Sequence, residues 1–112
     1  MSVPNPNVRL ALEQMDRQPD GMGGFTVSWR RLGWIWAEMV ARTPRDTGST
    51  LAIGPAVRWH ILTRAARAGD PRRPVPGQRL RHGQRLFRID AVAETDRAGH
   101  WLTIHAQEET KP

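Results

Sequence analysis

Cysteine and tyrosine are absent from this chain of 112 residues, and lysine occurs once, at Lys111. Without cysteine the chain has no disulfide, no thiolate zinc site and no cysteine nucleophile. No apolar run approaches the roughly 18 residues that a membrane-spanning helix requires. Residues 1–6 lack the charged and then apolar stretch of a secretion signal. We therefore expect a protein made in the host cytoplasm, with no membrane partner.

Motifs for catalysis and metal binding are also missing. The four histidines, His60, His82, His100 and His105, form no His-x-x-x-His or Glu-x-x-His pair. The sequence contains no Gly-x-Ser-x-Gly elbow, Walker loop or dinucleotide-binding fingerprint. The glycines at 21–24 lack the strand-to-helix context of a phosphate-binding loop. We therefore expect no enzyme activity, no metal and no cofactor.

Positive charge is in excess. Seventeen basic residues face 11 acidic ones, which gives a net charge of +6, and all the basic residues except Lys111 are arginine. A small domain with this charge is attracted to polyanions, and guanidinium groups bind phosphates or carboxylates with two hydrogen bonds. The arginines could equally form a solvated surface and ion pairs between subunits.

Short alternating segments separated by glycine and proline predict β-strands. The expected strands span residues 8–13, 25–29, 34–42, 56–64, 79–81, 85–92 and 100–106. Turn-forming residues fill the connections 16–24, 43–55 and 65–78. We predict an all-β fold, a small barrel or sandwich of about six short strands with long loops and at most one short helix.

One domain accounts for the length. We expect a flexible N-terminal arm at residues 1–7, a single β-barrel domain at residues 8–107 and a C-terminal tail at residues 108–112.

Residue parity along the strands predicts the core. The residues expected to face one shared interior are Val57, Trp59, Ile61, Phe87, Ile89, Leu102 and Ile104. The run 34–42 is apolar at both parities, so we expect it to be a central strand covered on both faces. The five tryptophans could stack on nucleic-acid bases, but a core or subunit interface is the commoner use of large aromatic side chains.

The order of these features resembles the small head–tail joining proteins of long-tailed phages, also called head-closure or stopper proteins. In residues 23–29, Gly-Gly-Phe-Thr-Val-Ser-Trp, a glycine-rich hairpin precedes a tryptophan, and Trp36-Ala37-Glu38 resembles the family's Trp-Ala-Glu strand. Residues 59–64 resemble the family strand that ends in a basic residue.

The closing third of the chain resembles the family too. Residues 83–92 follow the pattern of glycine, basic, aromatic, x, Ile, x, x, Val, and a last strand like 101–104 comes after a short turn. The resemblance covers residues 8–108. Residues 65–81 are richer in proline and arginine than the family pattern, so no contacts are carried over there.

The resemblance implies a β-barrel that assembles as a dodecameric ring in the neck of a virion or phage-like particle. Such a ring docks on the portal and its adaptor, offers a platform to the tail terminator or tail, and passes double-stranded DNA through its channel. The family's gate is the loop that corresponds to Thr43–Pro55. The gate residues would be Thr43, Pro44, Arg45, Asp46, Thr47, Gly48, Ser49 and Thr50, and Arg42 and Arg45 would contact DNA phosphates.

Several alternatives stay open. A tail-terminator ring is also a small β-barrel with a channel, and a free-standing nucleic-acid-binding barrel would act as a monomer. A phage, a prophage and a gene transfer agent would each suit the sequence.

Overall fold

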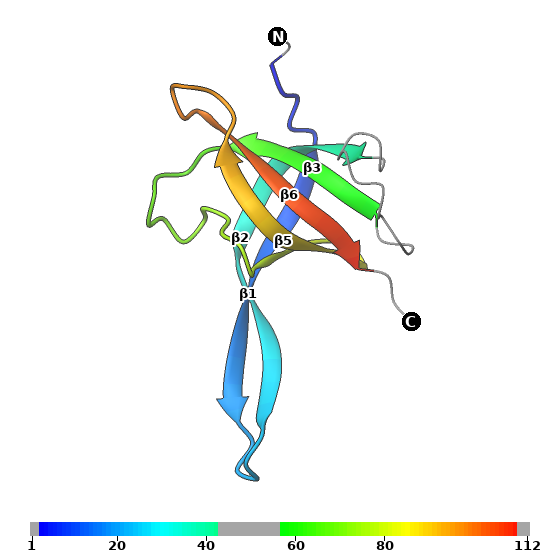
Figure 1. The fold of residues 1–112 in the computed structure, drawn as a ribbon, viewed down its shortest axis with the longest axis vertical. Helices are drawn as coiled ribbons and strands as arrows, with labels where there is room; N and C mark the ends of the chain where they lie inside the picture. Colours follow the sequence, from blue (N-terminus) through cyan, green and yellow to red (C-terminus); the bar gives the residue numbers. More distant parts are fainter. Residues whose placement is uncertain (1–2, 43–56, 110–112) are drawn as a thin grey trace.

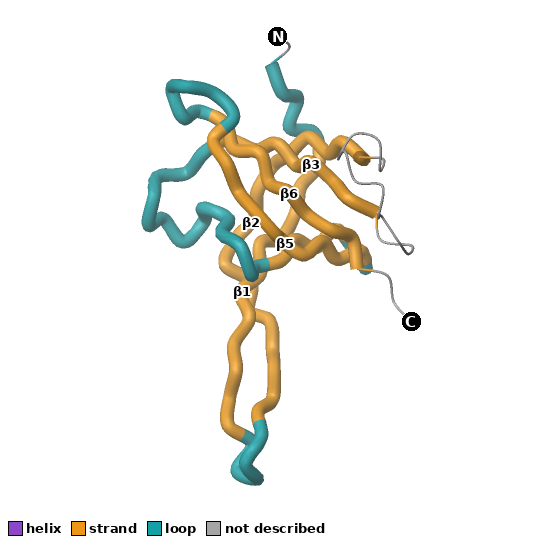
Figure 2. Tube along the Cα trace, in the orientation of Figure 1, coloured by secondary structure: helices purple, strands orange, loops and turns teal. Residues whose placement is uncertain are grey.

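Six antiparallel strands form one closed barrel in the computed structural model, which describes residues 3–42 and 57–109. The strands are β1 (Val8–Pro19), β2 (Phe25–Arg42), β3 (Val57–Arg64), β4 (Arg79–His82), β5 (Arg85–Glu94) and β6 (Trp101–Glu109). Their order around the barrel is β1-β2-β3-β6-β5-β4, and β4 pairs with β1 to close it (Figure 1). The described residues contain strands and loops without a helix, which confirms the all-β prediction (Figure 2).

Aliphatic side chains and Phe87 fill the barrel. The buried cluster takes residues from all six strands: Leu10, Leu12, Ile35, Ala37, Ile61, Leu80, Phe87, Ile89, Ile104 and Ala106. The Phe87 ring meets the Trp59 ring edge to face, with centroids 6.0 Å apart, an arrangement that aromatic pairs favour. Burial of these residues supplies the main driving force for folding.

Most residues expected in the core are buried: Ile61, Phe87, Ile89, Leu102 and Ile104. Trp59 is partly buried and packs against the cluster. The prediction for Val57 is wrong, because its side chain is 40% exposed. Val57 is the first residue of β3 and pairs with Glu108 near the end of β6, so it lies at the rim of the barrel, beyond the packed interior.

The first two strands are much longer than the sequence pattern predicts. β2 is continuous over 18 residues, where we expected two separate segments, and β1 runs on to Pro19. Residues 14–30, here called the β1–β2 extension, project from the barrel as a two-stranded ribbon (Figure 1). The molecule is consequently elongated, with extents of 54 × 35 × 24 Å.

A tight turn closes the β1–β2 extension. Asp20 Oδ1 accepts hydrogen bonds from the backbone N–H groups of Met22 and Gly24, at 2.8 and 3.0 Å. Gly21 and Gly23 adopt φ of 80° and 85°, a region that glycine enters without a steric penalty. The expected loop at 16–24 is therefore shortened to 20–24.

The last strand extends into the first residues of the expected C-terminal tail. β6 extends to Glu109, and Glu108 pairs with Phe87 across the sheet. The strand continues past the apolar pattern because the side chain of Glu108 has partners of its own, described below.

Candidate assembly surfaces

The whole expected gate loop lies outside the described part of the chain, with all of its named residues: Thr43, Pro44, Arg45, Asp46, Thr47, Gly48, Ser49 and Thr50. Arg42, the last residue of β2, is described and half-buried. Its Nε donates a hydrogen bond of 2.8 Å to Nδ1 of His60. The His60 ring in turn meets the His105 ring edge to face, with centroids 4.4 Å apart. Arg42 is thus held at the end of β2 by a side-chain contact across the sheet.

The outer face of β2 is exposed, contrary to the expectation of a strand covered on both faces. Ile35 and Ala37 point into the barrel, whereas Trp34 and Trp36 point outward and are 43% and 56% exposed. The guanidinium groups of Arg9 and Arg31 cover part of the Trp34 ring and leave both tryptophans accessible in the described chain. Of the two alternating sets of apolar residues in 34–42, the set with Ile35 and Ala37 is buried, and the set with Trp34 and Trp36 lies on the surface of the molecule.

A β-bulge carries this exposed face onto the β1–β2 extension. Leu12 pairs with Gly33 and Glu13 with Arg31, so β2 has one extra residue, Leu32, at this point. Such an insertion shifts which β2 residues share a face with those of β1. As a result, the outward side of the β1–β2 pair carries apolar residues on both parts: Met15, Phe25, Val27 and Trp29 on the extension, and Trp34 and Trp36 on the adjoining barrel part of β2.

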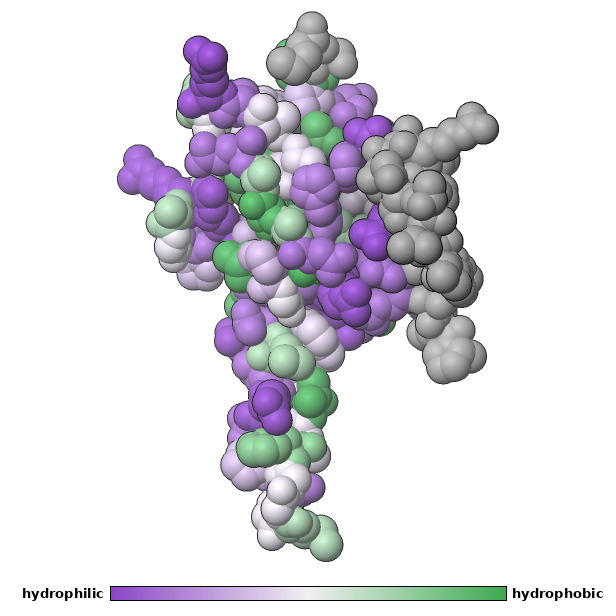
Figure 3. Space-filling view, viewed as in Figure 1, coloured by the Kyte–Doolittle hydropathy of each residue, from purple (hydrophilic) through white to green (hydrophobic). Residues whose placement is uncertain are grey.

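The opposite side of the extension is polar. Gln14 pairs with Arg30, Asp16 with Ser28 and Gln18 with Thr26, and all six side chains share one face. This face continues the side that holds Leu10 and Leu12 inside the barrel. The apolar pattern therefore changes sides where the ribbon leaves the barrel. In the view of Figure 3, hydrophobic residues alternate with hydrophilic ones along the extension.

Guanidinium groups stack on three of these outward-facing rings. Arg9 and Arg31 lie 4.2 and 4.9 Å from the ring centroid of Trp34, Arg17 lies 4.5 Å from that of Phe25, and Arg79 lies 4.0 Å from that of Trp29. Such cation–π pairs are worth about 0.5–1 kcal/mol each at exposed sites. We call the outward side of the β1–β2 pair, with these apolar residues and with Arg9, Arg17 and Arg31, the aromatic–arginine face.

A buried ion pair fixes the root of the extension. Arg79 Nε donates a hydrogen bond of 2.6 Å to Glu13 Oε1, and Arg81 Nε lies 3.2 Å from Glu13 Oε2. The Glu13 side chain is only 10% exposed. Because Arg79 also covers Trp29, the cluster ties the first residues of the extension to β4. Sequence analysis missed this cluster, since nothing local links Glu13 to arginines 66 and 68 residues away.

A second cluster joins the ends of β3, β5 and β6. Arg85 binds the Glu108 carboxylate with two hydrogen bonds of 2.8 and 3.0 Å, and Trp59 Nε1 donates a third of 3.1 Å. The Arg85 guanidinium lowers the pKa of Glu108 below its ordinary value, with a smaller lowering from the Trp59 N–H, while burial acts in the opposite direction. Glu108, expected in a solvated tail, instead stabilises the barrel rim.

Among the described residues, no three histidine or acidic side chains gather to hold a metal ion. The described part also has no helix that could cross a membrane. An open groove of about 590 Å³ borders Trp34 and Trp36 and includes Pro6, Arg64 and Ala66. The surface therefore offers aromatic rings, guanidinium groups and a shallow groove, which suit contacts with another macromolecule.

Comparison with known proteins places the chain in a family. The family model for the phage head completion protein matches residues 1–109. The chain belongs to this family of head completion proteins. A comparison with curated protein sequences finds no significant match.

The chain is also similar to solved structures. One is a chain from the virion of a native gene transfer agent particle, with 42% sequence identity, a TM-score of 0.79 and coverage of 96% of this chain and 98% of the other. Another is the solution structure of a Shigella flexneri 2a protein, with 21% identity, a TM-score of 0.71 and full coverage of both chains. The second likeness shows a shared fold.

The family match confirms the head-closure family that the sequence resembles, and it supports a structural role in a phage or phage-like particle. Sequence analysis found the strand that carries Trp34, Trp36 and Arg42. It did not find the continuous aromatic–arginine face, which depends on the bulge at Leu32. The alternation of Phe25, Val27 and Trp29 was the available signal.

Proposed function

We propose that this protein forms a ring in the neck of a phage or gene-transfer-agent particle, where it closes the DNA-filled head and provides the platform for the tail. The observation that carries this proposal is the head completion family match over residues 1–109. The chain of a gene transfer agent virion, 42% identical over nearly the whole length of both chains, supports it independently.

The ring would contain twelve copies, following the family resemblance, and would assemble on the portal and adaptor. Each copy carries a formal charge of +6, so free copies repel one another at low salt. We expect the isolated protein to be a monomer, which native mass spectrometry can check. Stable rings in dilute solution without the adaptor would contradict this order of assembly.

The test of the role is to produce particles without this protein. We expect filled heads that release DNA and do not join tails, and joining should be restored when the purified protein is added to the heads. Tailed, infectious or gene-transferring particles in its absence would overturn the proposal.

We also propose that Arg42 and Arg45 face double-stranded DNA in the channel, with residues 43–55 as the gate. Contacts of this kind involve phosphates, without sequence readout, and weaken as salt rises. Particles with Arg45→Ala, or with Arg42→Ala and Arg45→Ala, should leak more DNA than wild-type particles, with a difference that depends on salt.

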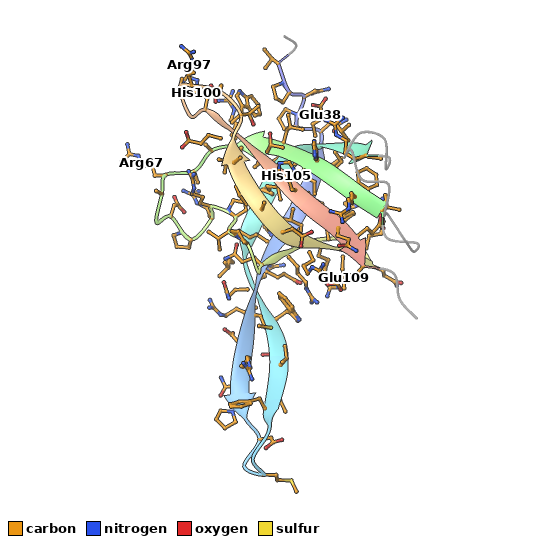
Figure 4. The ribbon with its side chains drawn as sticks, viewed as in Figure 1. Glu38, Arg67, Arg97, His100, His105 and Glu109 are labelled. Carbon is orange, nitrogen blue, oxygen red and sulfur yellow. The ribbon has the colours of Figure 1, made fainter. Side chains whose placement is uncertain are left out.

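The matched control is Arg97→Ala, which removes the same charge from the β5–β6 turn, where Arg97 points away from the barrel (Figure 4). Because Arg42 also binds His60, His60→Ala separates loss of that contact from loss of charge. Wild-type DNA retention in the double variant at every salt concentration would show that these arginines are not the DNA contact.

A further inference from the structure

The outward side of the β1–β2 pair keeps large apolar side chains exposed in the described chain, although guanidinium groups cover part of its rings. Of the nine large apolar residues with the most exposed side chains, five lie on the aromatic–arginine face: Met15, Phe25, Val27, Trp34 and Trp36. The side that would continue the barrel core is polar instead. A two-stranded ribbon gains little stability from exposed apolar residues, because a lone hairpin has no core to bury them. Exposed apolar residues on one side of the ribbon and polar residues on the other are the arrangement expected when the apolar side is buried against a partner.

The composition of this face matches a protein partner better than DNA. Tryptophan, phenylalanine, methionine and arginine are the residues enriched in the centre of protein–protein interfaces. Bases of duplex DNA are stacked inside the helix and offer no free ring for stacking, unlike single strands. Guanidinium groups already cover one side of the Trp34 and Phe25 rings. Met15 and Val27, which cannot stack at all, are exposed among them.

Charge indicates the kind of protein. Within the described residues, Arg9, Arg17 and Arg31 stack on rings but form no ion pair. An acidic surface on the partner would supply the carboxylates that these guanidinium groups lack. The apolar residues of the aromatic–arginine face would then be buried between these ion pairs.

A second copy of this chain is a poor source of such a surface. Most of its described carboxylates already accept bonds from arginines or backbone amides. Glu94 lies 3.8 Å from Arg73 as an ion pair. The two other described carboxylates, Glu38 and Glu109, lie on separate parts of the barrel (Figure 4). A copy also carries a net charge of +6.

We propose that the aromatic–arginine face docks on a different protein of the particle, at an acidic surface with apolar side chains between its carboxylates. This inference rests on the proposed structural role in the particle and specifies which side of the molecule makes that contact. Phe25 and Trp34 are the apolar anchors, and Arg17 and Arg31 pair with the partner's carboxylates.

The first test places the photoreactive residue p-benzoylphenylalanine at position 25 in assembled particles, followed by irradiation and mass spectrometry of the adduct. We expect a cross-link to another particle protein, at a peptide that contains aspartate or glutamate. The matched control is the same replacement at Thr26, the next residue along β2, on the polar side, where we expect no such adduct. An adduct only with a second copy, or only with DNA, would overturn the proposal.

The second test reverses charge on the same face. Arg17→Glu and Arg31→Glu should each weaken binding of the purified protein to isolated heads made without it by more than about tenfold, since like charges then face each other. Arg97→Glu makes the same change of charge on the β5–β6 turn and should bind as wild type does. Equal loss in all three variants would indicate attraction by net charge alone and would overturn the proposal.

The two proposals fail in different ways. If the unaltered protein restores tail joining but gives no protein adduct at position 25, the structural role stands and this docking surface is wrong. If the unaltered protein never enters particles, the structural role itself fails. Thermal melts of each variant show that loss of binding is not loss of folding.

Discussion

The barrel and the β1–β2 extension use the same residue types in opposite ways. The chain has two phenylalanines. Phe87 is fully buried in the barrel, whereas Phe25 on the extension is 57% exposed. Tryptophan shows a related contrast between the two faces of the barrel wall, since Trp59 packs against the core while Trp36 is exposed on the outer face of β2.

The difference teaches that apolar patterning has two purposes in this chain. In the barrel it selects the fold, because buried apolar area drives folding. On the extension and the adjoining outer face of β2 it leaves apolar side chains exposed, with arginines that stack on the rings. A pattern of alternating residues alone does not distinguish these purposes, so each must be tested by its effect on stability and on assembly.

The largest contrast should come from the two phenylalanines. Phe87→Ala leaves a cavity in the core and should lower the free energy of unfolding by about 3–5 kcal/mol, enough to unfold much of the population. Phe25→Ala should change it by about 0.5 kcal/mol or less, as expected for an exposed site. Urea denaturation of both variants measures the difference. Similar losses would show that the extension is part of the folding core.

The root of the extension should give the next largest effect. Glu13→Gln removes the charge that Arg79 and Arg81 share, and it should cost about 2–3 kcal/mol, because it leaves a buried arginine without its partner. Amide hydrogen exchange should speed up in residues 14–30 before it does in the barrel. Glu109→Gln, at the exposed end of β6, is the control and should have little effect.

The barrel could be predicted further than the extension, for physical reasons. Alternation around Ile61, Ile89 and Ile104 is visible in the sequence because each strand has one buried side. The single β2 strand was not visible, because Gly33 and the bulge at Leu32 interrupt the alternation. The turn formers Asp16 and Pro19 likewise suggested a loop where the structure has a paired strand.

The candidate surfaces were harder to predict than the strands. The aromatic–arginine face needs the register of β1 against β2, and the Glu13 cluster needs the neighbourhood of β4, which only closure of the barrel creates. Trp34 and Trp36 were recognised as core or interface residues, and the structure places both on the outside.

A smaller effect should appear at the barrel rim and depend on pH. Because the pKa of folded Glu108 lies below its ordinary value of 4.5, its ionised form stabilises the fold above the unfolded pKa. That contribution is lost as the pH falls through the lowered pKa of the folded state. Glu108→Gln should therefore be less stable than wild type by about 1 kcal/mol at neutral pH, given that Arg85 is half-exposed to solvent, and the difference should shrink in acid.

Urea titrations at several pH values from neutral to below 4.5 measure this difference. Asp70→Asn is the comparison, since hydrogen bonds from Arg72 lower the pKa of Asp70 as well. Both side chains lie in a solvent-exposed loop, so water screens the pair and we expect a smaller change. A difference between wild type and Glu108→Gln that does not vary with pH would contradict the assigned role of the carboxylate.

The smallest effect should come from the polar side of the extension. Asp16 and Arg30 form an ion pair of 3.1 Å with the arginine side chain 60% exposed, and such surface pairs contribute little because solvent screens them. Asp16→Asn should therefore change the free energy of unfolding by less than about 0.5 kcal/mol. It should also leave binding to isolated heads unchanged, because Asp16 faces away from the aromatic–arginine face. If Asp16→Asn weakens binding as strongly as Arg17→Glu, then both sides of the ribbon contact the partner, and the division into a docking side and a solvent side is wrong.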